Sequence, residues 1–499
     1  MTTKMEKPGS TRTAAIDLAP ERFRTIGHEL VDAIADWLGR MPGGLVTQGE
    51  PPADIRRILQ SERPLPEHGE DARDLINGTS SLLFDHSLFN GHPRFFGYIT
   101  SSAAPIGALA ELLAAAINQN VGSFKLSPLA TEIEAQTIRW IGELVGYPAG
   151  GDGVLVSGGN MANFVCFLAA RAAKAPWNIR TDGLAGHPRL RAYASSETHT
   201  WLQKAADLFG LGTEAIRWIP VDARQRMDTD ALEAQVDRDR AAGDVPCLVV
   251  GTAGSVSTGA VDPLPRIAEI CRTRGVWFHV DGAYGGLAAL APGAPDDLRA
   301  LALADSVAVD PHKWLYAPLE AGCALVRRPA DLTRAFSYHP AYYHFDDDGA
   351  INFVDRGLQN SRGFRALKVW LALRQVGRAG AIAMIADDMR LARRLDARVR
   401  EHPDFEPLSQ DLSITTFRYV PADLRARAAA PDAEKRLDDI NQAVLTRIEK
   451  SGQAFLSNAV VNGKYALRAC IVNFRTSEAD IDGLLPLIAG LAGGVADRG

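Results

Sequence analysis

Short apolar runs alternate with helical patterns between about residues 150 and 330, and this alternation limits the possible folds more than any other feature. The apolar runs stand at 153–156, 191–195, 245–251, 276–280 and 306–309. A helix between two strands allows the strands to run parallel, so the pattern predicts an α/β domain with a mostly parallel sheet. Ligands of such sheets bind beyond the carboxyl ends of the strands, and the residues after each strand are therefore the first candidates for a site.

Two strand ends carry a lysine and a carboxylate. The segment 305–315, DSVAVDPHKWL, breaks at Pro311 and presents Lys313, while the segment 276–286, VWFHVDGAYGG, presents Asp281 before small residues. A lysine at the mouth of a sheet can attack an aldehyde, although a solvated loop lysine is the alternative for Lys313 taken alone. A lysine and a carboxylate at successive strand ends are the two fixed partners of pyridoxal 5'-phosphate (PLP).

The motifs DPHKWL and HVDGAYGG resemble the PLP-dependent decarboxylases of the aromatic-L-amino-acid, histidine and glutamate decarboxylase group. The resemblance extends from about Ala19 to the C-terminus. It implies fold type I (aspartate aminotransferase-like), with a mostly parallel central sheet, a small α+β C-terminal domain and an N-terminal helical segment. The corresponding domain boundaries are 1–100 for the helical segment, 101–370 for the PLP-binding domain and 371–499 for the small domain.

The resemblance also implies roles for single residues. Lys313 would bind PLP covalently, Asp281 would face the ring nitrogen, and His199 would stack on the ring. Ala283 is small, as a flat ring above it requires. The other cofactor contacts implied are Gly159, Asn160, Ser255, Ser101, Asp310 and His312, with Thr252 as a second choice to Ser255. Position 310 departs from the commonest animal pattern, in which asparagine is usual.

The stretch Ser157 to Asn160, SGGN, lies between the apolar run 153–156 and a helical pattern that extends to Ala173. A strand, a glycine turn and a helix together aim free backbone N–H groups at an anion. Glycine also lets a phosphate approach the backbone closely. A dinucleotide site is not predicted, because the GxGxxG pattern is absent. The turn is therefore a candidate site for the PLP phosphate.

Substrate contacts and a proton donor are implied by the resemblance as well. Phe95 and Phe124 match substrate-pocket positions, with ordinary packing as the alternative. The segment that starts at Ser337 is aromatic and acidic without a clear period, which predicts a mobile loop. Within it Tyr342 matches the tyrosine that marks decarboxylases, and the adjacent Tyr343 leaves the register open by one residue.

These features predict decarboxylation of an L-amino acid to the amine and carbon dioxide. The aromatic side chains favour an aromatic substrate, and glutamate, aspartate or a diamino acid remains an alternative. Another fold type I activity also remains open, namely that of an aminotransferase, an aldehyde lyase or an aldehyde-forming decarboxylase.

Composition and N-terminal pattern bear on partners and location. The formal net charge is −6, which argues against nucleic acid as a partner, and no apolar run is long enough to predict a membrane span. Five scattered cysteines without a CxxC pair predict a reducing, cytoplasmic environment and no metal site. The N-terminus lacks an apolar signal-peptide core. An apolar stripe over Pro20 to Leu38 and the segment GHPRFFGY at 91–98 predict a homodimer, although the stripe fits packing on its own core equally well.

Overall fold

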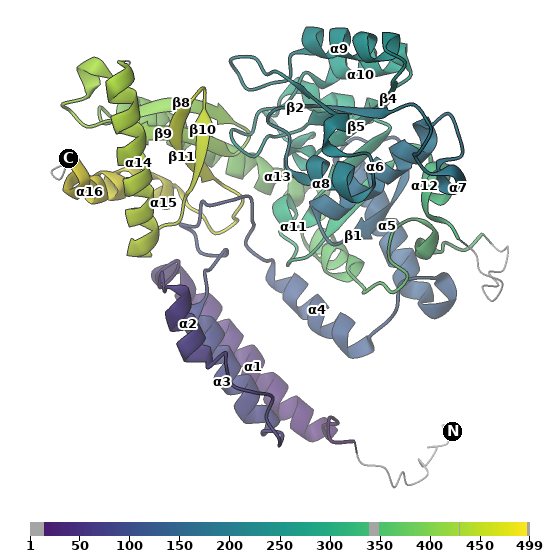
Figure 1. Ribbon diagram of the computed structural model, residues 1–499. Coiled ribbons are helices and arrows are strands. Elements are labelled where there is room, and N and C mark those ends of the chain that lie inside the picture. Colours follow the sequence, from purple (N-terminus) through teal and green to yellow (C-terminus); the bar gives the residue numbers. More distant parts are fainter. Residues whose placement is uncertain (1–13, 339–348, 429, 497–499) are drawn as a thin grey trace, which may run out of the picture. The chain divides into compact units, whose positions relative to one another are not determined.

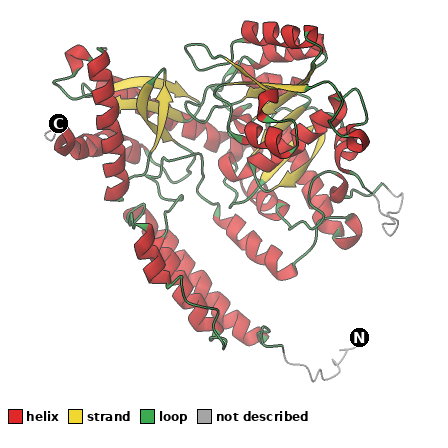
Figure 2. Ribbon diagram, viewed as in Figure 1, coloured by secondary structure: helices red, strands yellow, loops and turns green. Residues whose placement is uncertain are grey.

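The computed structural model describes residues 14–338, 349–428 and 430–496 (Figure 1). Contacts divide the chain into two units. The first comprises the residues up to 89 together with 450–453, and the second comprises 90–449 and 454–499. Strands occur only in the second unit of the described chain, where they form two separate groups (Figure 2).

The first unit consists of helices. Its helices are α1 (Pro20–Arg40), α2 (Pro52–Leu59) and α3 (Ala72–His86). Proline opens α1 and α2, where its missing N–H costs nothing. The apolar stripe of α1 packs against α3, and the ring of Trp37 stacks on Phe84 with centroids 5.4 Å apart. Phe23 and Val31 of the same stripe stay exposed, so α3 covers only part of it.

A seven-stranded sheet forms the centre of the second unit, in the order β1-β7-β6-β5-β4-β2-β3. Only β7 runs antiparallel to its neighbours, so the mostly parallel sheet expected from the sequence is present. Its strands are β1 (Asp152–Val156), β2 (Leu190–Ser195), β3 (Ile216–Ile219), β4 (Val245–Thr252), β5 (Trp277–Asp281), β6 (Ser306–Val309) and β7 (Gly322–Val326).

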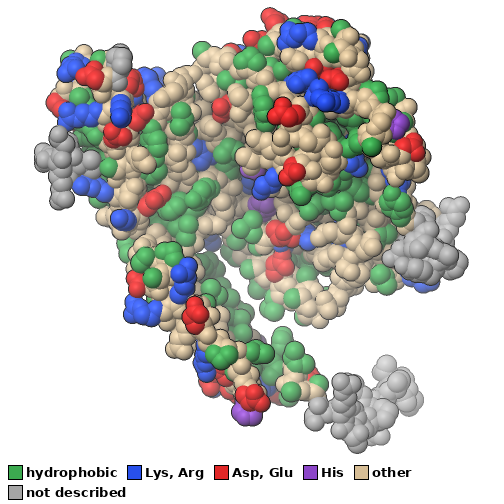
Figure 3. Space-filling view, in the orientation of Figure 1, with side chains coloured by type: hydrophobic (Ala, Val, Ile, Leu, Met, Phe, Trp, Pro, Cys, Tyr) green, Lys and Arg blue, Asp and Glu red, His purple; other side chains and the backbone are tan. Residues whose placement is uncertain are grey.

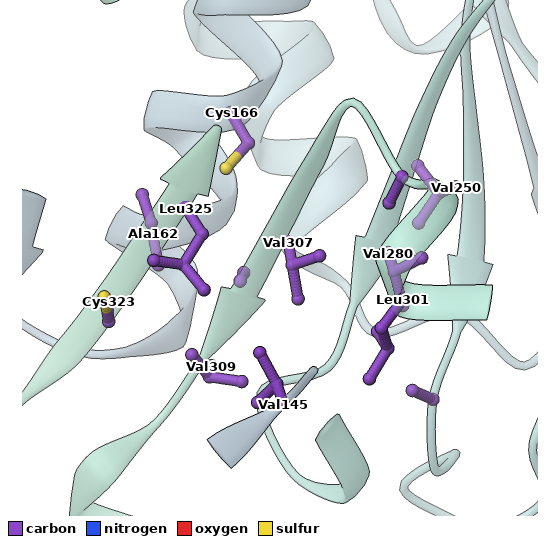
Figure 4. Packing of buried hydrophobic residues seen from close by; sticks show 14 of the residues in the cluster. Val145, Ala162, Cys166, Val250, Val280, Leu301, Val307, Val309, Cys323 and Leu325 are labelled. Carbon is purple, nitrogen blue, oxygen red and sulfur yellow. The ribbon is translucent and has the colours of Figure 1, made fainter. Parts of the chain in front are cut away.

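Helices and turns cover the sheet, and its central strands are buried along their whole length. Figure 4 shows side chains of this core, among them Val307 and Val309 of β6, Leu325 of β7 and Ala162 of the helix that follows β1. The helices of this region are α4 (Pro105–Ile117), α5 (Pro128–Leu144), α6 (Gly159–Lys174), α7 (Ile179–Asp182), α8 (Trp201–Leu208), α9 (Thr229–Ala241), α10 (Leu264–Arg274), α11 (Pro311–Trp314) and α12 (Pro329–Phe336).

A four-stranded antiparallel sheet, in the order β10-β11-β9-β8, forms the C-terminal part. Its elements are β8 (Phe405–Asp411), β9 (Ile414–Tyr419), β10 (Ser457–Val461), β11 (Lys464–Cys470), α14 (Pro431–Ser451), α15 (Glu478–Asp482) and α16 (Leu484–Ala496). Phe96 lies in the core beside this sheet, and the ring of Phe95 stacks on Phe455 at 5.3 Å. The segment 91–98 therefore has a packing partner within its own chain, which corrects one of the two grounds for expecting a homodimer.

Helix α13 (Ala366–Glu401) connects the two sheets and is interrupted at Gly377, whose φ is +67°. Among the described helices it alone is long and apolar enough to cross a membrane by length and composition. It packs against α4, α5, β8 and β9, and its Asp388 is buried. These contacts make α13 a packed helix of the fold, and apolar residues along it, among them Val369, Leu373, Ile385 and Leu391, lie in the core.

Candidate active site

The carboxyl ends of β5 and β6 carry the lysine and the carboxylate predicted to hold the cofactor. Asp281 is the last residue of β5, and Lys313 lies in α11, directly after β6. The two strands are parallel neighbours, so both ends meet at one edge of the sheet. Together with His199, in the turn after β2, both side chains line a cavity of about 380 Å³. The structure therefore brings the three central predicted residues together.

The N-terminus of α6 opens into the same cavity. Gly158 precedes it with φ +95°, a conformation that favours glycine. A Cβ atom at Gly159 would stand 2.7 Å from Oδ2 of Asp310 and 3.1 Å from Cβ of Ala283, so a side chain there would collide with the cavity wall. No described side chain caps this helix. Its first N–H groups, including that of Asn160, are therefore available to an anion.

Polar contacts fix the turn that carries Lys313. Its Nζ lies 3.1 Å from Oδ2 of Asp310, and Ser101 Oγ donates to the backbone oxygen of His312 at 2.7 Å. The backbone N–H of Ala321 donates to Nδ1 of His312 at 3.1 Å, and burial lowers the pKa of His312. The ring is therefore neutral, with its proton on Nε2, which lies 3.6 Å from Asp310 Oδ2. The amine of Lys313, the imidazole of His312 and the carboxylate of Asp310 thus all line the same cavity.

His199 lies at the rim of the cavity. Its Nδ1 accepts the backbone N–H of Trp201 at 3.3 Å. Partial burial lowers the pKa of His199, and the charge of Lys313 acts in the same direction, while Asp281 opposes both. A neutral, flat ring at this position is suited to lie against another aromatic ring.

These residues fit PLP. Lys313 would take its aldehyde carbon, Asp281 would face its ring nitrogen, and the α6 N-terminus with the Nε2–H of His312 would receive its phosphate. Oδ1 of Asp310 is buried with no hydrogen-bond partner among the described residues, so the site holds a polar atom that a bound group can satisfy.

Ser255 does not line the cavity, although it was a predicted cofactor contact. It is buried, and its Oγ lies 3.0 Å from Oγ1 of Thr258 within the same turn. Its neighbours Gly254 and Val256 line the cavity, and so does Thr252. The second choice of the sequence analysis is thus better placed than the first.

The predicted substrate contacts are not part of the cavity wall formed by this chain. The Phe95 ring is used in the stack on Phe455. Phe124 begins a short 3-10 turn, and its N–H donates to Oδ1 of Asn352 at 3.3 Å. Their roles toward the substrate stay predictions. Tyr342 lies outside the described residues.

The sequence analysis missed several residues of the site. Those that line the cavity include Ile99, Asn163, Glu197 and Tyr284. Arg468 of β11 is almost fully buried, and its Nη1 donates to the backbone oxygen of Tyr98 at 3.1 Å. Its Nε and Nη2 are buried with no partner among the described residues. An arginine inside the apolar run YALRACIV was the available sign, because buried arginines need partners.

A larger cavity of about 840 Å³ lies elsewhere, between α6, α7 and α12. It is lined by Arg171, Arg180 and Phe336 among others, and by none of the predicted site residues. Size alone would select this cavity. The smaller one is the candidate active site because the convergent titratable groups lie there.

Comparisons with known proteins identify the family of the chain. Residues 52–420 match the "Pyridoxal-dependent decarboxylase conserved domain". The chain is 32% identical to the "Aromatic-L-amino-acid decarboxylase" of Bacillus atrophaeus, over 96% of this chain and 97% of that protein. It is 30% identical to the "Acidic amino acid decarboxylase GADL1" of Bos taurus, over 88% of this chain and 85% of that protein.

A solved structure shares the fold. The "Crystal structure of Oryza sativa TDC with PLP and tryptamine" superposes with a TM-score of 0.89 at 27% identity, covering 97% of this chain and 100% of that one. The expected fold type I architecture and the PLP cofactor are therefore confirmed. The chain belongs to the pyridoxal-dependent decarboxylase family and is a PLP-dependent amino-acid carboxy-lyase.

Proposed function

We propose that the protein decarboxylates an aromatic L-amino acid to the corresponding amine and carbon dioxide. The observation that carries the proposal is the convergence of Lys313, Asp281 and His199 on one cavity. The aromatic substrate class is supported by the name of the Bacillus atrophaeus relative. The apolar side chains of Ile99 and Val256 and the ring of Tyr284, all in the cavity wall, also favour it.

Bound PLP supplies an electron sink for the bond between Cα and the carboxylate. The residues of the chain divide the remaining work. Lys313 would be the attachment point, Asp281 would favour the protonated ring nitrogen, and His199 would lie against the ring. Arg468 is the candidate partner of the substrate α-carboxylate. It is a buried cation, and two of its nitrogens have no hydrogen-bond partner among the described residues. Its third nitrogen is hydrogen-bonded to the backbone oxygen of Tyr98, which precedes the cavity residue Ile99.

A panel of L-amino acids tests the substrate class. Carbon dioxide and amine are measured for tryptophan, tyrosine, phenylalanine, glutamate, aspartate, cysteine sulfinate and 2,4-diaminobutyrate. We expect the highest kcat/KM with an aromatic substrate. The identity to GADL1 is almost as high as to the aromatic enzyme, so preference for an acidic substrate is the specific result that would overturn the proposal. Aldehyde in place of amine would assign the chain to the aldehyde-forming activity.

We further propose a cytoplasmic homodimer. The apolar helix α4 supports the dimer, since Leu109, Leu112, Leu113 and Ile117 are each about half exposed in one chain. Charges of both signs are interspersed over the face seen in Figure 3, as for a protein without a polyanionic partner. The five cysteines are free thiols, all buried, which suits a reducing compartment.

A further inference from the structure

The indole N–H of Trp201 donates to Oδ2 of Asp281 at 2.8 Å, although the two residues are 80 positions apart. Trp201 is fully buried, and Asp281 is 8% exposed. We propose that Trp201 is a positioning residue that fixes the Asp281 carboxylate for the ring nitrogen of PLP. The inference rests on the proposed function, because it assigns Asp281 to that nitrogen.

The remaining contacts of Asp281 leave this task to Trp201. From the residues that the structure describes, Oδ1 accepts a longer bond of 3.2 Å, from the backbone N–H of Ala283. The indole bond is thus the shorter of the two, and it fixes one oxygen of a residue that lines the cavity. Indole is a donor that cannot accept, so its N–H suits a carboxylate oxygen. Fixing Oδ2 therefore sets the direction of the whole carboxylate.

His279 does not share the task. Its Nδ1 lies 2.9 Å from Ser306 Oγ, and its Nε2 lies 2.7 Å from Oδ1 of Asn163. Both ring nitrogens are thus in use, and burial holds the pKa of His279 well below its ordinary value, so the ring is neutral. The edge of the Trp201 indole meets the His279 ring at 88°, with centroids 5.7 Å apart. His279 is therefore held by its own hydrogen bonds and packs against the indole of Trp201.

The position of Trp201 in the chain links two functions. It is the first residue of α8, and its backbone N–H donates to Nδ1 of His199. The same turn of backbone therefore positions two groups. One is the imidazole of His199, which is expected to lie on the PLP ring, and the other is the indole N–H of Trp201, which holds the Asp281 carboxylate for the ring nitrogen of PLP. A shift of this turn would misplace both groups at once.

Trp201→Phe tests the proposal, because it removes the N–H and keeps a buried aromatic ring. The full-length protein is stripped of PLP and titrated with it, and the dissociation constant is read from the visible absorbance band. We expect PLP binding about tenfold weaker or more, the fold-change typical of losing a hydrogen bond to a charged group. We expect kcat to fall more than KM rises, since the substrate does not touch the indole.

Trp277→Phe is the matched control. Trp277 is also fully buried and lies in β5 with Asp281, but its N–H donates to Ser306 Oγ at 2.8 Å. The same substitution there should lower the melting temperature and leave the PLP dissociation constant within about twofold. Equal weakening of PLP binding in both variants would make the Trp201 effect a general packing defect and would overturn the proposal.

A double-mutant cycle identifies the route of the effect. If Trp201 acts through Asp281, Trp201→Phe has no further effect on PLP binding in an Asp281→Asn background; an additive loss would contradict the proposal. If Trp201→Phe does not fold, Trp201→His takes its place, because it retains a ring N–H. PLP binding by this variant that is closer to that of the wild type than to that of Asp281→Asn supports the proposal, and binding as weak as that of Asp281→Asn contradicts it. Failure of wild-type protein to bind PLP through Lys313 would instead refute the proposed function, so the two failures are distinguishable.

Discussion

At the scale of single residues, the chemistry depends on which groups face the amine of Lys313. Asp310 Oδ2 lies 3.1 Å from its Nζ, and Nε2 of the neutral His312 lies 3.6 Å from the same oxygen. The carboxylate of Asp310 is therefore close to both the amine and the imidazole. The position of the amine is fixed by the strand end and by the bond from Ser101 to the backbone of the turn.

Lys313→Ala should abolish the visible absorbance of bound PLP and lower turnover about a thousandfold or more, because the covalent attachment point is lost. Absorbance spectra and carbon dioxide release measure both effects. Lys204→Ala is the control, since Lys204 is exposed on α8 close to His199 and contributes to its electrostatics. Retained decarboxylation in Lys313→Ala would contradict the assignment.

Tyr342→Phe should still release carbon dioxide while forming less amine. The phenol is predicted to return a proton to Cα and to exclude oxygen, so its loss would divert the substrate with O₂ and water to aldehyde, ammonia and hydrogen peroxide. The measurement is the yield of amine, aldehyde and peroxide per carbon dioxide. Tyr343→Phe is the matched variant. Unchanged amine yield in Tyr342→Phe would remove this residue from the mechanism, and a loss only in Tyr343→Phe would shift the register by one.

At the scale of elements, α13 holds the lysine turn through one buried carboxylate. Asp388 accepts the indole N–H of Trp314 at 2.9 Å and the hydroxyl of Tyr316 at 2.7 Å. The Trp314 ring also stacks on Tyr284, with centroids 4.6 Å apart, and the Tyr284 hydroxyl lies 2.6 Å from Ser413 Oγ. Both chains of contacts connect the end of the large sheet to the elements around the small sheet.

Asp388 predicts a distinct dependence of stability on pH. Burial raises its pKa from 3.8 to about 7. Because the pKa is raised in the folded protein, the stabilisation that Asp388 gives to the folded state is fully present below pH 3.8. This stabilisation is lost as the pH rises from 3.8 to about 7, and it does not change further above pH 7. Asp388→Asn keeps a hydrogen-bond acceptor but cannot titrate, so it removes this loss of unfolding free energy. The loss amounts to at most about 1.4 kcal/mol per pH unit between the two pKa values.

The difference in unfolding free energy between wild type and Asp388→Asn should therefore move in favour of the variant from pH 4.5 to pH 7.5. Urea unfolding at several pH values measures it. Asp387→Asn is the control, because Asp387 is exposed and pairs with Arg390 on the surface. A difference that does not vary with pH would show that Asp388 is not protonated in the folded protein near neutrality.

At the scale of the whole molecule, the apolar face of α4 needs a cover. Four large aliphatic side chains on one helix form a larger exposed apolar surface than scattered surface residues do. A second copy of the chain is the occupant that the proposed homodimer supplies.

We expect light scattering to give a dimer of the 53.7 kDa chain. Leu112→Asp should raise the dimer dissociation constant at least about tenfold, because the interface would bury an unpaired charge. Leu303→Asp is the control, since Leu303 is 57% exposed on another surface. An active monomer, or equal effects of both variants, would contradict a dimer that uses α4.

The sequence by itself determined five of the seven strands of the large sheet and the lysine and carboxylate at two strand ends, because these follow from local patterns and from motifs only a few residues long. Strands β3 and β7 were not among the predicted runs. Boundaries were close: the run 306–309 is β6, and the run 153–156 lies within β1 at Asp152–Val156. Helix α13 continues past a break at Gly377, because packing of its second half outweighs one glycine.

Only the tertiary structure decided which distant groups meet. Trp201 meets Asp281, Asp388 meets Tyr316, and Arg468 meets Tyr98, in each case across 70 or more positions of the chain. Local propensity carries no information on such pairs, since they form when whole elements pack and buried polar groups are brought to hydrogen-bond partners. For the same reason Phe95 packs against Phe455 within its own chain, a contact that the residues around it did not indicate.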